Sequence, residues 1–219
     1  MLHVKIFTFN PLQENTYLVS NADGDCIIID PGCYDGAERE ALSDHIMTHN
    51  LRPALLVNTH CHLDHVFGEK FVAETWGLVP HFHALEQRLF ELAPSSGLMW
   101  NLPFDSWAGP CTHIPAGVPL VLGQDRLEVL FTPGHSPGSL SFHDPIGGFV
   151  ISGDVLFRGS IGRTDLPGGD MNTLERSIRD VLYRLPDNTV VFSGHGPATS
   201  IGQEKRHNPY VPASDQEEA

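Results

Sequence analysis

Short apolar runs separated by turn residues constrain the fold of this chain more than any other feature of its 219 residues. Seven of them are three to five residues long, rich in β-branched side chains, and bounded by Gly, Pro, Asn or Asp. Runs of this length and composition predict strands, several of them buried on both faces. They are Val4–Phe7, Thr16–Val19, Cys26–Ile29, Leu55–Val57, Leu127–Phe131, Phe149–Ile151 and Thr189–Phe192.

Helical patterns lie between these runs. Ala37–Met47 carries apolar residues on one side, and His65–Trp76 does the same before Gly77. The third pattern, Asn172–Leu185, starts with capping-box spacing between Asn172 and Glu175 and carries a stripe of leucine, isoleucine and valine. Strands and helices that alternate along the whole chain predict a layered α/β protein.

The remaining stretches predict little regular structure. Ala93–Pro119 has no clear period, and we expect a long loop with short helical pieces, of the kind that often borders a site. No linker or low-complexity run divides the chain. We therefore expect one domain over residues 1–213, followed by a polar tail at 214–219.

Charge and hydropathy exclude some classes of partner. The net charge is −14, with 13 Lys and Arg against 27 Asp and Glu, so the clustered cations that bind nucleic acid are missing. No window resembles a membrane span or a signal peptide, which predicts a cytoplasmic protein that binds neither nucleic acid nor membrane. The four cysteines show no CxxC pair and are too few for a disulfide scaffold.

Four of the predicted strands are each followed at once by histidine or aspartate. Leu55–Val57 leads into His60-Cys61-His62-Leu63-Asp64-His65, and the other three lead to single residues. Ligands of layered α/β proteins usually bind at the carboxyl ends of strands, so we expect these side chains to converge. The single residues are His135 after Leu127–Phe131, Asp154 after Phe149–Ile151 and His195 after Thr189–Phe192.

This set of side chains indicates a metal centre. Imidazole and carboxylate suit borderline cations such as Zn²⁺, Fe²⁺ or Mn²⁺, with zinc the first expectation. Seven candidate ligands exceed what one ion uses, so they imply two ions that share a bridging carboxylate and a bridging water. Solvent-exposed capping of strand ends is the alternative, and it explains a single histidine better than four strand ends with the same chemistry. The other histidines do not follow predicted strands in this way and are expected to serve surface or core packing. His81 and His83 form a similar pair, but no acidic residue follows it.

The segment from Thr59 to His65, followed in order by His135, Asp154 and His195, resembles the metallo-β-lactamase superfamily. The resemblance implies an αββα sandwich of two facing mixed sheets flanked by helices, with a dinuclear metal site at one sheet edge. It implies that His60, His62 and His135 hold the first ion, that Asp64, His65 and His195 hold the second, and that Asp154 bridges them. It also implies that Asp30, in Asp30-Pro31-Gly32, orients a ligand histidine.

A narrower resemblance is to glyoxalase II-like hydrolases of the short bacterial type. It is carried by Ser152–Phe157, Ser160–Asp165, Asn15–Leu18 and the segment from Gly194 to Pro209. It implies a small-molecule thioester substrate, S-lactoylglutathione or a related hydroxyacyl thiol. A bridging hydroxide would attack the carbonyl, with Asp64 accepting a hydrogen bond from this nucleophile. Class B β-lactamases have Cys or His where this chain has Asp154, so antibiotic hydrolysis is not expected as the main activity.

The same resemblance implies residues that bind the substrate. Arg163 stands where the family has a cation that contacts glutathione, and Lys205 and Arg206 are candidates for the substrate carboxylates, with a solvated tail as the alternative. Full-length glyoxalase II has a helical C-terminal domain that binds glutathione, whereas about two dozen residues follow His195 here. The thiol carrier is therefore left open, as is the oligomeric state.

A persulfide dioxygenase is the main alternative. This type shares the fold but uses one Fe²⁺ held by two histidines and one aspartate, which here would be His60, His135 and Asp154. The complete second ligand set favours the hydrolase. Cys61, between two ligands, is expected to be a small buried residue and not a redox group.

Overall fold

The computed structural model describes residues 1–212. Two six-stranded mixed sheets face each other in it. The first sheet has its strands in chain order, antiparallel from β1 to β3 and parallel from β3 to β6. Its strands are β1 (His3–Phe9), β2 (Glu14–Ser20), β3 (Asp25–Ile29), β4 (Arg52–Val57), β5 (Pro80–Phe82) and β6 (Thr112–His113).

The second sheet has the order β14-β13-β10-β9-β8-β7. Its strands are β7 (Leu120–Leu122), β8 (Asp125–Phe131), β9 (Leu140–Asp144), β10 (Phe149–Gly153), β13 (Val190–Ser193) and β14 (Thr199–Ser200). Strand β9 is antiparallel to both β8 and β10, and β13 is parallel to β10. Strands β8, β10 and β13 therefore end at the same edge. A small hairpin, β11 (Leu156–Phe157) with β12 (Ser160–Ile161), follows β10.

The main core lies between the two sheets. Alternate residues of one strand point to opposite faces, so Ile27 and Ile29 of β3 enter this core while Ile28 packs under the helices outside. From the second sheet, Leu127 of β8 and Phe142 of β9 meet them, both fully buried. This alternation explains why the strands are almost uninterrupted apolar runs: both faces are covered.

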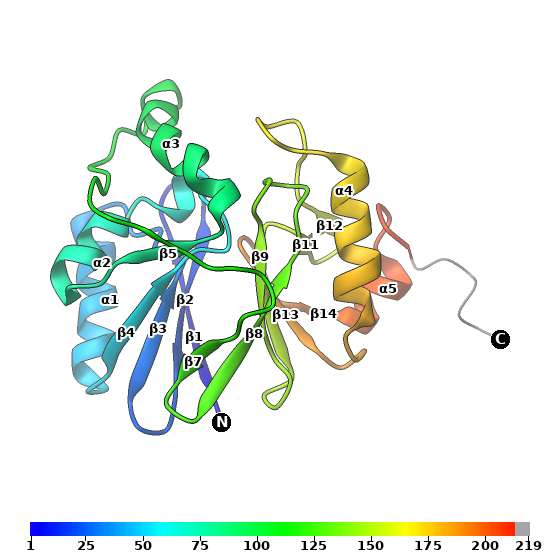
Figure 1. Ribbon diagram of the computed structural model, residues 1–219, viewed down its shortest axis with the longest axis horizontal. Coiled ribbons are helices and arrows are strands. Elements are labelled where there is room, and N and C mark those ends of the chain that lie inside the picture. Colours follow the sequence, from blue (N-terminus) through cyan, green and yellow to red (C-terminus); the bar gives the residue numbers. More distant parts are fainter. Residues whose placement is uncertain (213–219) are drawn as a thin grey trace.

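Helices cover the outer faces of both sheets (Figure 1). On one side lie α1 (Gly36–Thr48) and α2 (Glu69–Trp76), and on the other lie α4 (Met171–Arg176) and α5 (Ile201–His207). A fifth helix, α3 (Gln87–Met99), lies above the ends of the strands of the first sheet in the same view. The predicted sandwich of two mixed sheets flanked by helices is confirmed.

Two predicted helices have different starts. The second begins at Glu69, because Leu63–His65 forms a separate 3-10 turn, and it ends at Gly77 in the left-handed conformation as predicted. The last helix is capped by Asp170, whose side chain accepts a hydrogen bond from the Thr173 N–H, so the Asn172 capping box was wrong. After α4 it continues as a π turn, Ser177–Val181, and a 3-10 turn, Leu182–Arg184.

The predicted loop at Ala93–Pro119 was wrong in its first part. Helix α3 continues through Pro94 to Met99, and β6 lies further along the same stretch. Pro94 is in the interior of the helix, where proline removes a hydrogen bond, and this concealed the helix in the sequence. The tail predicted for residues 214–219 lies outside the described residues. No helix in the described part of the chain is long and apolar enough to cross a membrane.

One prediction concerns the contact between the sheets. The hydroxyl of Tyr17 in β2, a residue 1% exposed, donates a hydrogen bond of 2.6 Å to the carbonyl of Ser193 at the end of β13. We expect Tyr17→Phe to lower the free energy of unfolding by about 1 kcal/mol, because one buried cross-sheet hydrogen bond is lost. Urea denaturation measures this. Tyr210→Phe is the matched control, since Tyr210 is exposed, and an equal loss in both variants would contradict the assignment.

Candidate metal centre

The predicted ligands all lie at one edge of the sandwich. The segment Asn58–His65 follows β4 of the first sheet, and His135, Asp154 and His195 follow β8, β10 and β13 of the second. A main-chain hydrogen bond joins the sheets here, because the Asn15 N–H of β2 donates to the Gly194 carbonyl at 2.7 Å. Within the second sheet, the Gly194 N–H donates to the Gly153 carbonyl at 2.8 Å. The edge is therefore a rigid junction of two sheets.

Two glycines permit the close approach of these loops. A Cβ at Gly194 would lie 2.1 Å from Asp154 Oδ1 and 2.8 Å from the His65 ring. Gly153 has φ +52°, and its Cβ would lie 2.3 Å from the Thr59 hydroxyl. Any larger residue would displace the groups of the site, so the glycines before Asp154 and His195 are required by packing.

His60, His62 and His135 form the first group. Each offers a nitrogen within 4.8 Å of the others, and His62 Nδ1 lies 2.8 Å from His135 Nε2. His60 and His135 are buried. This is the set that the sequence predicted for the first ion.

Asp64, His65 and His195 form the second group, and their ligand atoms also lie within 4.8 Å of one another. His195 Nε2 is 3.1 Å from Asp64 Oδ2, and His65 Nε2 is 3.9 Å from the same oxygen. Asp64 and His65 come from the 3-10 turn after β4, whereas His195 follows β13, so the two sheets both contribute.

Asp154 lies between the two groups. Its Oδ2 is 3.6 Å from His135 Nε2 of the first group and 3.6 Å from His195 Nε2 of the second. Its Oδ1 is 3.5 Å from His65 Nε2. A carboxylate in contact with both sets has the position that a bridging ligand requires.

The ring nitrogens that face away from the cluster are hydrogen-bonded. His135 Nδ1 lies 2.7 Å from the Arg163 carbonyl, and His195 Nδ1 lies 3.1 Å from the Leu12 carbonyl. Because a carbonyl only accepts, each of these nitrogens carries the proton and leaves Nε2 with a lone pair toward the cluster. His65 Nδ1 contacts Asp30 Oδ2 at 3.1 Å, which places Asp30 where the sequence predicted an orienting carboxylate.

Burial and charge set the protonation of the cluster. Burial lowers the pKa of His62 to about 3 and, with the neighbouring imidazoles, holds the pKa of His60 well below its ordinary value. Burial also acts against the charged forms of His65 and Asp154, but their mutual attraction prevails, raising the pKa of His65 and lowering that of Asp154. The cluster thus combines neutral imidazoles at His60 and His62 with an ionised carboxylate at Asp154, whereas His65 holds a proton that a bound cation would displace.

The donor set fits metal ions. In the described part of the chain, eight side chains have a buried polar atom without a hydrogen-bond partner, and four of these atoms belong to the cluster. They are Nε2 of His60, His62 and His65, and Oδ1 of Asp154. Such atoms cost about 1–3 kcal/mol each when left unpaired, and cations bound in the two groups would satisfy all four.

The predicted substrate-binding cations are placed differently from one another. Arg163 lines the cavity over the cluster, where its guanidinium makes two hydrogen bonds of 2.7 Å to Asp165. Lys205 and Arg206 do not line this cavity, and both face Asp187, with Lys205 Nζ 2.8 Å from its carboxylate. The expectation that these two residues reach the site is therefore corrected: α5 directs them to its own ion pairs.

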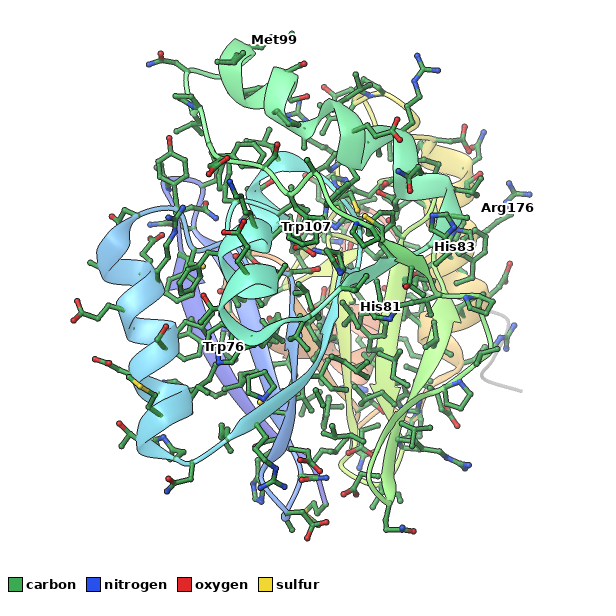
Figure 2. All side chains as sticks on the ribbon, turned by 60° about the vertical axis from the view of Figure 1, so that its left-hand side comes forward. Trp76, His81, His83, Met99, Trp107 and Arg176 are labelled. Atoms are coloured by element: carbon green, nitrogen blue, oxygen red, sulfur yellow. The ribbon has the colours of Figure 1, made fainter. Side chains whose placement is uncertain are left out.

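His81 and His83, which the sequence predicted to serve surface or core packing, lie outside the cluster and contact the backbone. These two residues flank Phe82 at the end of β5 (Figure 2). His81 Nδ1 lies 2.7 Å from the Val79 carbonyl, and His83 Nδ1 accepts a hydrogen bond from the Leu85 N–H. Cys61 is buried, and burial raises the pKa of its thiol well above the ordinary value, which keeps it protonated as expected for a packing residue.

Glu86, which no sequence pattern indicated, connects the loop after β4 with the loop after β8 by hydrogen bonds. This fully buried carboxylate accepts the Cys61 N–H at 2.8 Å, between His60 and His62, and the Gly138 N–H at 2.6 Å. The hydroxyl of Ser136, next to His135, donates to it as well. Burial raises the pKa of Glu86 against the effect of these hydrogen bonds. Its partners lie 25 and about 50 residues away in sequence, so no local pattern indicates the role.

A cavity of about 970 Å³ opens over the cluster. Its lining residues include His62, Asp64, His135, Asp154 and His195 of the cluster. Its volume is in the range of small-molecule sites. The ligand cluster is therefore reachable by a substrate.

Two facing mixed sheets with a histidine–aspartate cluster at the carboxyl ends of their strands define a metal-dependent enzyme of the αββα type. The sequence profile of the metallo-beta-lactamase superfamily matches residues 9–195. The chain belongs to this superfamily, as the Thr59–His65 motif predicted.

Curated relatives share the length of the chain. A probable metallo-hydrolase, YqgX of Bacillus subtilis, is 40% identical over 92% of this chain and 93% of its own. The hydroxyacylglutathione hydrolase GloC of Haemophilus influenzae is 36% identical over 96% of this chain and 98% of its own. These relatives support a metallo-hydrolase.

Solved structures of related proteins superpose over the whole fold. The BLEG-1 B3 metallo-beta-lactamase is 37% identical with a TM-score of 0.86, covering 96% of this chain and 99% of that one. TTHA1623, in a di-iron-bound form, is 40% identical with the same score, covering 95% and 100%. ETHE1 from Myxococcus xanthus is 26% identical with a score of 0.77, covering 95% and 84%.

The role of Glu86 is testable. We expect Glu86→Ala to weaken Zn²⁺ binding about 10- to 100-fold and to lower the unfolding temperature, because two buried N–H groups lose their acceptor and both ligand loops loosen. Competition with a chromophoric chelator measures the affinity. Glu91→Ala, at an exposed position of α3, is the control. Unchanged Zn²⁺ affinity in Glu86→Ala would contradict this role.

Glu69 gives a pH-dependent prediction. Burial raises the pKa of this carboxyl from 4.5 to about 8. Between these values the unfolded chain has lost the proton that the folded protein retains, so the free energy of unfolding falls as pH rises from about 4.5 to 8. We expect Glu69→Gln to remove this part of the slope, up to about 1.4 kcal/mol per pH unit. Urea titrations of both proteins across this range measure it, and parallel curves would refute the prediction.

Proposed function

We propose that this protein is a dinuclear-metal hydrolase that cleaves a thioester of the hydroxyacylglutathione type. The observation that carries the proposal is the convergence of two complete ligand groups on Asp154, which contacts both. The hydroxyacylglutathione hydrolase GloC, similar along almost the full chain, supports the substrate class.

We assign the first ion to His60, His62 and His135, the second to Asp64, His65 and His195, and the bridge to Asp154. Zinc is the first expectation, and iron, which a similar protein holds as a pair, and manganese are the alternatives. Two such cations would polarise a carbonyl and lower the pKa of a water molecule to about 7. The partner is the small-molecule substrate alone; nucleic acid and membrane are not proposed as partners.

The chain's own residues position the reactants. Asp64 lines the cavity, and its pKa is lowered, against the effect of burial, by the charge of His65 and by the contact with His195. Its carboxylate is therefore ionised at neutral pH and can accept the proton of the attacking water. The thiolate that leaves is stable at neutral pH and needs no dedicated acid. Asp30 and the Arg163 carbonyl hold the His65 and His135 rings toward the substrate side.

A persulfide dioxygenase is the second candidate, supported by the similarity to ETHE1 from Myxococcus xanthus. This activity would use His60, His135 and Asp154 around one iron. The four other ligands would then serve no purpose, although His62, Asp64, His65 and His195 all point into the same cluster. The dinuclear assignment uses every member of the cluster, which is why we prefer it.

The test is a substrate panel with the metal-loaded protein. We expect the rate of S-lactoylglutathione hydrolysis, measured as the loss of thioester absorbance, to exceed two other rates. These are the rate of oxygen consumption with glutathione persulfide and the rate of hydrolysis of the cephalosporin nitrocefin. Nitrocefin is included because of the similarity to a B3 metallo-beta-lactamase. Oxygen consumption without thioester cleavage would overturn the proposal in favour of the dioxygenase.

The role of Asp64 predicts a kinetic signature. We expect Asp64→Asn to reduce kcat for S-lactoylglutathione by about 100-fold or more, because an amide cannot accept the proton of water. Asp23→Asn, on an exposed turn, is the charge-matched control. Steady-state kinetics are measured together with metal content, since Asp64 is also assigned as a ligand. An Asp64→Asn variant with normal metal content and wild-type kcat would exclude this role.

A further inference from the structure

The cavity over the metal centre is walled largely by apolar side chains. Helix α3 supplies Leu89, Leu92 and Met99, and Trp100 follows its end. The hairpin after β10 supplies Phe157 and Ile161 from the other side. Apart from the ligands of the centre, few polar groups face this space.

These apolar side chains are unusually open to solvent. Leu92 is 44% exposed, Met99 is 85% exposed and Trp100 is 53% exposed, and Met99 projects at the outer end of α3 (Figure 2). Each becomes more stable when an apolar group covers it, by about 25 cal/mol per Å² removed from water. Exposed apolar residues that rim a site reached by substrate indicate that the substrate itself carries the apolar group.

One cation at the same cavity is free to bind an anion. Arg163 is neutralised by its two hydrogen bonds to Asp165. Arg158, exposed at the cavity wall, has no hydrogen bond or ion pair within residues 1–212. In a protein of net charge −14, an unpaired arginine beside the site provides local attraction for an anionic group that the rest of the surface repels.

We propose that the site takes thioesters with an aliphatic acyl chain and an anionic thiol carrier. Leu92 and Trp100 bind the chain, and Arg158 binds the anion. The inference rests on the proposed thioester hydrolysis, in which the thioester carbonyl lies at the metal centre. The acyl chain then extends toward Leu92 and Trp100, and the carboxylates of the thiol carrier extend toward Arg158. It deepens that function, because it ranks medium-length acyl groups above the polar lactoyl group.

Acyl-chain length is tested first. We expect kcat/KM to be at least about tenfold higher for hexanoyl-glutathione than for propionyl-glutathione, since each added methylene contributes about 0.8 kcal/mol when buried. Leu92→Asp should abolish this difference. Leu98→Asp is the matched control, because Leu98 lies in α3, is 70% exposed and does not line the cavity. Equal kcat/KM for both thioesters in the wild type would overturn the proposal.

The anionic arm is tested with a neutral carrier. We expect Arg158→Ala to lower kcat/KM for hexanoyl-glutathione about tenfold and to leave hexanoyl-N-acetylcysteamine unchanged, because only glutathione carries carboxylates. Arg176→Ala, an exposed arginine of α4, should affect neither substrate. A similar loss with both thioesters in Arg158→Ala would overturn the role of Arg158.

Binding without turnover separates this inference from the proposed function. Calorimetry with the thioethers S-hexylglutathione and S-methylglutathione needs no catalysis. Tighter binding of S-hexylglutathione, lost in Leu92→Asp and kept in Leu98→Asp, supports the apolar arm even where no thioester is cleaved. Hydrolysis of S-lactoylglutathione together with equal binding of the two thioethers would leave the hydrolase intact and overturn the inference.

Discussion

The junction of the two sheets at one edge is the constraint on which the site depends. Asn15 of β2 reaches across with its main chain and its side chain, and its Nδ2 donates to the Ser193 and Gly196 carbonyls on either side of His195. Unpaired backbone groups at a buried strand end would be costly, so these hydrogen bonds fix where the loop after β13 meets β2 of the other sheet. The candidate ligands of both sheets converge because these hydrogen bonds hold the two sheets together at this edge.

Burial of so many titratable groups determines the chemistry. His60, His65 and Asp154 have buried atoms without partners, which is unfavourable in the protein alone. Cations supply the missing partners, so metal binding and the stability of this edge are linked. Two buried carboxylates hold the cluster from outside it. Glu86 accepts the Cys61 N–H between His60 and His62, and Asp30 contacts Nδ1 of the His65 ring.

The sequence predicted that these histidine and aspartate side chains come together, because they follow strands that could be recognised from their own apolar runs. It could not predict that α3 continues through Pro94, since the tertiary contacts of its buried residues, Phe90, Ala93 and Gly97, outweigh local propensity. Lys205 and Arg206 looked available because their partner, Asp187, is distant in the chain. Glu86 and Arg158 carry no motif at all, and their roles are visible only once the loops around them are folded.

Metal content per chain is the most direct test of the assignment of two metal ions to this cluster. The protein is purified without added metal or chelator and analysed for zinc, iron and manganese, and then titrated with Zn²⁺. We expect close to two ions per chain, reached as prepared or after titration, with the second lost in His195→Ala. One iron and no second site would contradict the dinuclear assignment, and no metal taken up at all would contradict every enzyme activity considered for this cluster.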